Sequence, residues 1–154
     1  MAADVAVVKE KVQTYLRELV GGFEVDKDGD YTFRHGSTRV FIDVDEWAGD
    51  HVAVAITAMV AADTPASPEL FEYVATEGNA YRMGTLRAGK QEDGTVMTLL
   101  THQLLGDFLD PDEFKLAVAL LAEAADGADT EIVKRFGGRT FHEDEDEDGE
   151  DKAE

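Results

Sequence analysis

The chain has 154 residues, contains no cysteine and carries a formal net charge of −20 from 34 acidic and 14 basic side chains. Its length suits a single domain with a sizeable core. The absence of cysteine excludes a disulfide scaffold, thiolate metal ligands and a cysteine nucleophile. The strong negative charge disfavours the phosphate backbone of nucleic acids and anionic membrane surfaces, so we expect neither as a partner.

The negative charge is concentrated at the C-terminus. Residues 142–154 hold nine acidic residues and one lysine, a charge of −8, and the other 141 residues carry −12. We therefore expect a folded domain over residues 1–141 and a disordered acidic tail over residues 142–154. The first residues lack the basic region of a signal peptide and no apolar run has the length of a membrane span, so we expect a cytoplasmic protein.

The first third of the chain predicts a helix followed by short strands. Apolar residues recur at spacings of three and four from Val5 to Leu19, which indicates an amphipathic helix that ends at Gly21-Gly22. A short strand over residues 23–25 comes next. Asp28-Gly29 is typical of a hairpin turn, and it leads into a strand that begins at Tyr31.

The stretch over residues 38–60 is the centre of the predicted sheet. In its first strand Val40, Ile42 and Val44 alternate with more polar residues, which indicates one buried face. The second strand, residues 51–60, is apolar on both faces, which is typical of a strand in the middle of a sheet. We expect the chain to leave the sheet at Ala61.

The second half predicts a helix, two strands and a long helix. The short helix begins with Ser67-Pro68, and its expected buried residues are Leu70, Phe71 and Val74. Strands over residues 82–91 and 95–105 flank an Asp-Gly hairpin turn.

The last helix begins with the strongest start signal in the chain, Asp110-Pro111. Gly127 leaves open whether the helix is continuous or broken, because glycine costs about 1 kcal/mol inside a helix. We favour one helix to Phe136. Its expected apolar face includes Phe114, Ala117, Leu121, Ala124, Ala128 and Ile132, widened by Leu116, Val118 and Leu120.

The resulting order is α-β-β-β-β-α-β-β-α, an α+β fold with an antiparallel sheet flanked by helices. The chain resembles type III secretion chaperones and, in particular, the YbjN-like proteins over residues 4–138. The resemblance rests on the opening VVKEKVQTYLRELV, the strand Tyr31–Phe33, the segment 36–44, Asn79, Ala124-Ala125-Asp126 and Phe136-Gly137-Gly138. It implies an acidic homodimer that binds an extended segment of a partner protein, and YbjN itself suggests a regulator. It supplies no catalytic residues.

No catalytic or metal-binding motif is present. The four histidines lack metal-ligand spacing, and neither a phosphate-binding glycine loop nor a GxSxG elbow occurs. Asp43 and Asp45 share one strand face and could bind a cation or act as acid and base, although a solvated sheet face is favoured. We expect no enzyme activity, no metal site and no cofactor.

Aromatic and acidic side chains are the candidates for partner binding. An aromatic cluster ringed by acids would suit a peptide with basic and apolar residues. Alternatively, the second and third helices cover Phe41 and the two tyrosines as ordinary core. The candidate residues are Phe41, Asp43, Asp45, Trp47, Tyr73 and Tyr81.

The sequence therefore favours a non-catalytic, chaperone-like or regulatory module that binds a protein or peptide, with a basic segment as the expected partner. One alternative is a regulator that responds to a small ligand or metal in a pocket between helix and sheet lined by Asp43 and Asp45. A second is an acidic mimic of nucleic acid that acts through the tail.

Overall fold

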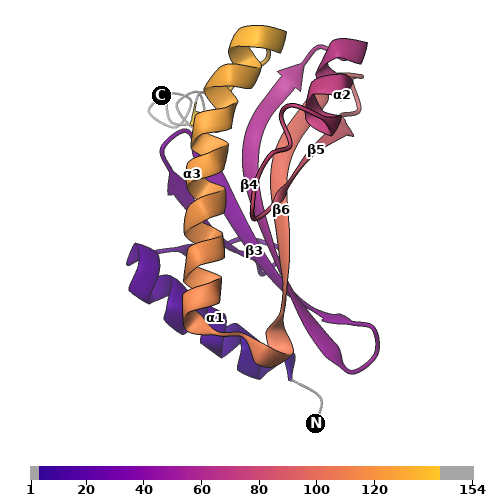
Figure 1. Ribbon diagram of the computed structural model, residues 1–154. Helices are drawn as coiled ribbons and strands as arrows, with labels where there is room; N and C mark the ends of the chain where they lie inside the picture. The colour runs from indigo at the N-terminus through magenta and orange to yellow at the C-terminus, as the bar shows by residue number, and fades with distance from the viewer. Residues whose placement is uncertain (1–3, 143–154) are drawn as a thin grey trace.

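A computed structural model describes residues 4–142 and contains one six-stranded antiparallel sheet with helices on one face (Figure 1). The order of strands across the sheet is β1-β2-β3-β4-β6-β5. The elements are α1 (Val5–Val20), β1 (Glu24–Val25), β2 (Tyr31–His35), β3 (Thr38–Trp47), β4 (His51–Thr64), α2 (Pro68–Ala75), β5 (Thr85–Lys90), β6 (Val96–Leu105), a 3-10 turn (Gly106–Phe108) and α3 (Pro111–Phe136). This is the predicted fold class and the predicted order of elements.

Each helix begins where the sequence indicates. The side chains of Asp4 and Asp110 accept hydrogen bonds from the first free amides of α1 and α3, and Ser67 does the same for α2. The chain leaves α1 at Gly21, whose φ of 79° suits glycine. The long helix α3 continues through Gly127, as predicted, because its buried face extends to Ile132.

The central position of β4 is also confirmed. It pairs with β3 from Trp47↔His51 to Val40↔Ala58, and with β6 on its other side. The prediction that the chain leaves the sheet at Ala61 is wrong. Two irregularities in the register carry β4 on to Thr64, and Asp63 adopts a φ of 55° there. A bulge lets a strand bend and continue, and alternation of residue types cannot show it.

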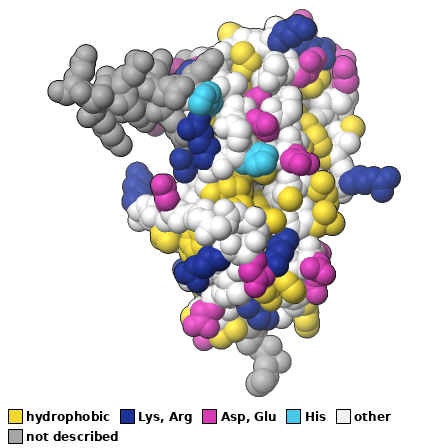
Figure 2. Space-filling view, turned by 90° about the vertical axis from the view of Figure 1, so that its left-hand side faces the viewer, with side chains coloured by type: hydrophobic (Ala, Val, Ile, Leu, Met, Phe, Trp, Pro, Cys, Tyr) yellow, Lys and Arg dark blue, Asp and Glu magenta, His cyan; other side chains and the backbone are white. Residues whose placement is uncertain are grey.

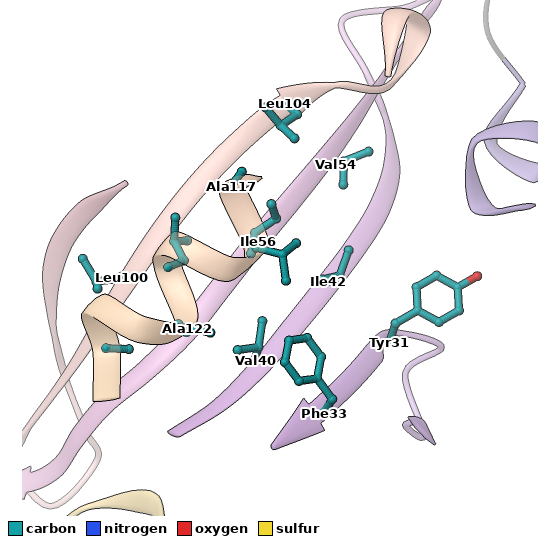
Figure 3. Packing of buried hydrophobic residues seen from close by; sticks show 14 of the residues in the cluster. Tyr31, Phe33, Val40, Ile42, Val54, Ile56, Leu100, Leu104, Ala117 and Ala122 are labelled. Atoms are coloured by element: carbon teal, nitrogen blue, oxygen red, sulfur yellow. The ribbon is translucent and has the colours of Figure 1, made fainter. Parts of the chain in front are cut away.

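The core lies between the sheet and the layer formed by α1 and α3 (Figure 3). Alternate residues of β3, β4 and β6 face this layer and are buried. The largest fully buried side chains are Phe114, Leu16, Ile42, Ile56, Leu70, Leu100, Leu121 and Ile132. Three residues predicted to be buried are exposed, Phe71, Leu116 and Leu120, because they lie on the outer sides of their helices.

The opposite face of the sheet, here called the open face, has no described helix packed on it. The side chains between the buried ones along β3, β4 and β6 are mostly half-buried, and some near the strand ends are exposed. The helix α2 lies beside β5 and the end of α3, where Tyr73 packs on Phe136 with ring centroids 5.3 Å apart. The described part of the chain therefore has one sheet, with a helical layer on one face and no helix on the other.

Candidate functional site

A groove runs between the end of α1, the strand β2 and the middle of α3. Its wider part has a volume of about 590 Å³, and an apolar extension toward α3 adds about 160 Å³. Figure 2 looks onto this side of the molecule and shows hydrophobic side chains gathered between charged ones. Both parts share Leu19, Val20, Phe33 and His35. The extension is completed by Val118, Ala119, Ala122 and Glu123 of α3.

The outer edge of β2 borders this groove. The strand β1 pairs with β2 only at Tyr31 and Thr32, so no described strand covers the edge of β2 beyond Thr32. The other edge of the sheet is formed by β5, and a side chain covers part of it. There the side chain of Asn79 accepts a hydrogen bond from the amide of Leu86 at 2.9 Å and donates one to its carbonyl at 3.2 Å. One sheet edge is thus capped by a side chain, and the other opens into a groove.

The apolar wall of the groove is held by contacts on both sides. Phe33 is only 7% exposed and belongs to the core cluster. Phe23 packs edge-on against Tyr31 at 5.5 Å, and the guanidinium of Arg17 lies 5.5 Å from the centre of the Phe23 ring. Gln13 donates a hydrogen bond to the hydroxyl of Tyr31 at 2.9 Å. The wall is therefore preformed, which lowers the entropic cost of binding.

The hairpin between β2 and β3 is fastened to α3 by Ser37. Its amide and hydroxyl lie 2.8 Å and 2.7 Å from the same carboxylate oxygen of Asp126, and its hydroxyl also contacts the carboxylate of buried Asp129. These hydrogen bonds, with the amide contributing most, lower the pKa of Asp126. Gly36 has a φ of 55°, and a Cβ there would lie 2.3 Å from Asp126. Only glycine fits this close approach.

Basic side chains form one rim of the groove. Arg34, His35 and Arg39 line it next to the hairpin. Arg39 lies 3.7 Å from the carboxylate of Glu24 and donates a hydrogen bond to the hydroxyl of Thr32 at 3.3 Å. Bases are gathered at this rim in a chain that is strongly acidic as a whole.

The partner-binding residues predicted on β3 lie together, but outside the groove. Phe41, Asp43 and Asp45 share the open face, where the register places them opposite Thr57, Ala55 and Ala53 of β4. Asp43 raises the pKa of Asp45 through a hydrogen bond between the two side chains and through its like charge.

The other predicted aromatics are dispersed. Trp47 is 58% exposed at the end of β3, with its ring 6.4 Å from that of His51. Tyr73 and Tyr81 are half-buried and pack against the core, and burial is the main cause of the raised pKa of each. Figure 1 places α2, which carries Tyr73, at the opposite end of the molecule from the hairpin between β3 and β4. The six predicted residues therefore do not form one cluster.

Sequence reasoning missed the groove. The sequence predicts Leu19 on the apolar face of a helix and Phe33 on a strand, and both lie there, but no local pattern indicates that these two residues lie side by side. The available signal was the difference in strand length, because a strand over residues 23–25 cannot cover all of its longer neighbour.

The described part of the chain has neither a metal-ligand cluster nor a membrane-spanning helix. No group of three or more histidine, cysteine, aspartate or glutamate residues among residues 4–142 could hold a metal ion. None of the described helices has the length and apolar character needed to cross a membrane. The predicted acidic tail, apart from His142, lies outside the described residues.

Comparison with known proteins identifies the family. A family model described as "T3SS (YopN, CesT) and YbjN peptide-binding chaperone 1" matches residues 5–144. The chain belongs to this family, TY-Chap1. No curated protein sequence matches significantly.

Solved structures support the TY-Chap1 fold. One similar chain comes from the HopA1-SchA chaperone-effector complex, with a TM-score of 0.58, 12% identity, and coverage of 83% of this chain and 98% of that one. Another is YbjN from E. coli, with a TM-score of 0.56, 15% identity, and coverage of 86% and 92%. The resemblance to secretion chaperones and YbjN is confirmed. The description of the family as peptide-binding chaperones is consistent with the predicted protein-binding module.

Proposed function

We propose that this chain binds an extended, apolar peptide segment in the groove beside β2, where the segment adds as a further strand to the sheet. The observation that carries this proposal is the open edge of β2 beyond Thr32 next to a preformed apolar wall. Strand addition supplies affinity through main-chain hydrogen bonds, and pockets for alternate side chains supply selectivity.

The lining of the groove supports strand addition. An added strand lies about 4.8 Å from its neighbour, and its alternate side chains point to the two faces of the sheet. Side chains on the helical face would enter the extension lined by Val118, Ala119 and Ala122. Side chains on the other face would point to solvent.

The binding activity is non-catalytic, and we propose a cytoplasmic chaperone or adaptor that keeps one segment of a partner extended. The description of the family as peptide-binding supports this function.

The test begins with peptides of twelve residues selected by display on the full-length protein. In Ala119→Glu a carboxylate enters the apolar extension, and we expect the affinity for the best peptide to fall at least tenfold, about 1.4 kcal/mol. The matched control is Ala53→Glu, because Ala53 is also half-buried but lies beside a small hollow on the open face. Equal losses in both variants, or no loss in Ala119→Glu, would exclude the groove.

A second experiment tests strand addition itself. Methylation of a peptide amide removes one main-chain donor, so methylation at successive positions should weaken binding at alternate positions only. A uniform effect, or none, would show that the peptide is not a strand of the sheet. Calorimetric titration of the methylated series measures this pattern.

The open face is a second surface, and we propose that it joins two copies of the chain as a homodimer. The face carries Asp43 and Asp45 on β3 and Arg87 on β5, so a two-fold arrangement would set acidic residues of one copy against a basic residue of the other. Exposed Trp47 adds apolar area beside it. A basic partner segment is the alternative occupant, attracted by the same aspartates. Sedimentation of the parent and of Asp43→Arg tests the dimer, which the variant should weaken.

A further inference from the structure

The bases at the rim of the groove are unexpected in so acidic a chain. Arg34, His35 and Arg39 line its wall, and Arg17 stacks on Phe23 beside them. Glu24 lies near Arg39, and Glu123 stands across the groove on α3. Arg34, His35 and Arg39 form a basic rim next to the hairpin, and on the hairpin itself Ser37 contacts the carboxylates of Asp126 and Asp129. A positively charged rim of this kind attracts an anionic segment.

The chain itself carries a strongly anionic segment that begins close to this rim. After α3, Arg139 pairs with Ala62 of β4. The pairing of β3 with β4 ends at Val40↔Ala58, four residues before Ala62, so Arg139 pairs with β4 beyond the end of β3 that is nearest the hairpin between β2 and β3. The described chain ends three residues later, at His142. The described chain thus ends close to the end of the sheet that carries the hairpin between β2 and β3.

The length and charge of this segment suit the rim. Residues 143–154 contain nine acidic residues and one lysine. Twelve residues span up to about 40 Å when fully extended. The basic rim is therefore within reach, and tethering gives the segment an effective concentration on the order of millimolar.

We infer that the acidic segment 143–154 docks on Arg34, His35 and Arg39 and competes with peptides for the groove. The docking follows from charge and position alone, and its regulatory consequence rests on the proposed peptide function. A peptide must displace the segment, so weakly bound or acidic peptides are rejected. An apolar peptide that forms main-chain hydrogen bonds along β2 displaces it.

The absence of cysteine allows a direct test on the full-length protein. The substitution Ala153→Cys introduces a single thiol for a nitroxide spin label, and the label broadens the amide resonances of nearby residues. We expect several-fold faster transverse relaxation at the amides of Arg34, His35 and Arg39 than at those of Arg87 and Ala88 on the far edge of the sheet. At molar salt, where the Debye length is about 3 Å, this difference should disappear.

Two variants complete the test. Arg34→Glu with Arg39→Glu should abolish the selective broadening. The matched control is Arg82→Glu with Lys90→Glu, two exposed bases outside the groove, and it should retain the broadening. Replacement of the nine tail acids by asparagine and glutamine should abolish it without any change in the folded domain. Broadening that is uniform, that falls elsewhere on the domain or that survives neutralisation of the tail would overturn the docking. Because no added peptide is present, a failure of the proposed function would leave this result unchanged.

Discussion

The substitution Ser37→Ala tests how the hairpin beside the groove is held. The hydroxyl of Ser37 lies between the carboxylates of Asp126 and Asp129, and Asp129 is fully buried on α3. In the alanine variant Asp126 keeps the amide of Ser37, at 2.8 Å. Asp129 loses this donor and retains the hydroxyl of Thr130, at 3.0 Å.

The expected loss follows from the charge and burial of these partners. A hydrogen bond to a charged group contributes about 1.5–3 kcal/mol. We therefore expect the free energy of unfolding to fall by about 2 kcal/mol, which corresponds to a decrease in Tm of about 4–8 °C for a domain of this size. Urea titration at neutral pH measures this loss, and the slope of unfolding free energy against urea concentration should be unchanged.

The other serine of the chain provides the control. Ser67 accepts a hydrogen bond from the amide of Leu70 at 3.1 Å and caps α2, so Ser67→Ala should cost about 1 kcal/mol. If Ser37→Ala costs less than about 0.5 kcal/mol, a typical surface effect, the hairpin is not fastened through this hydroxyl.

Three further predictions concern the core, the far edge of the sheet and the dependence on pH. Leu121→Ala should cost about 2–5 kcal/mol in urea titration because Leu121 is fully buried, and Leu120→Ala on the exposed side should cost less than about 1 kcal/mol; similar losses would contradict the assigned helix face. Asn79→Ala should speed hydrogen exchange at the amide of Leu86 at least tenfold, since that amide loses its acceptor; an unchanged rate would mean that the edge is protected in another way. The pKa of Asp126 is lowered by Ser37, so its carboxylate stabilises the fold above about pH 4, and this contribution is lost as the pH falls through the lowered pKa. The stability difference between the parent and Asp126→Asn should thus be largest at neutral pH and shrink toward pH 3, and a constant difference would exclude a role for the charge.

Most of the fold could be predicted because its signals are local. Period-two alternation identified β3, capping residues identified the helix starts, and Asp28-Gly29 identified a turn. Gly36 belongs to a segment that carries the resemblance, but only the folded structure explains why a glycine is needed there, because it lies against the carboxylate of Asp126. Asp126 lies 90 residues further along the chain, and no periodic pattern indicates that their atoms nearly touch.

The groove was harder to predict because it forms where no described strand pairs with the second half of β2. Residues such as Leu19 and Ala119 have the polarity of ordinary helix faces, and only their distance from the end of β1 makes them a groove wall. The aromatic and acidic residues of β3 instead favoured the open face as the predicted binding surface. Phe41 does lie there with Asp43 and Asp45, so the predicted strand face is correct, and whether it binds a partner remains a proposal.

The central claim is that a peptide becomes the neighbour of β2. Intermolecular nuclear Overhauser effects between a display-selected peptide and the full-length protein test it most directly. Strand addition predicts a ladder of main-chain contacts from the peptide to Phe33, Arg34 and His35. Contacts to Phe41 and Ala55 on the open face, without any to β2, would contradict it.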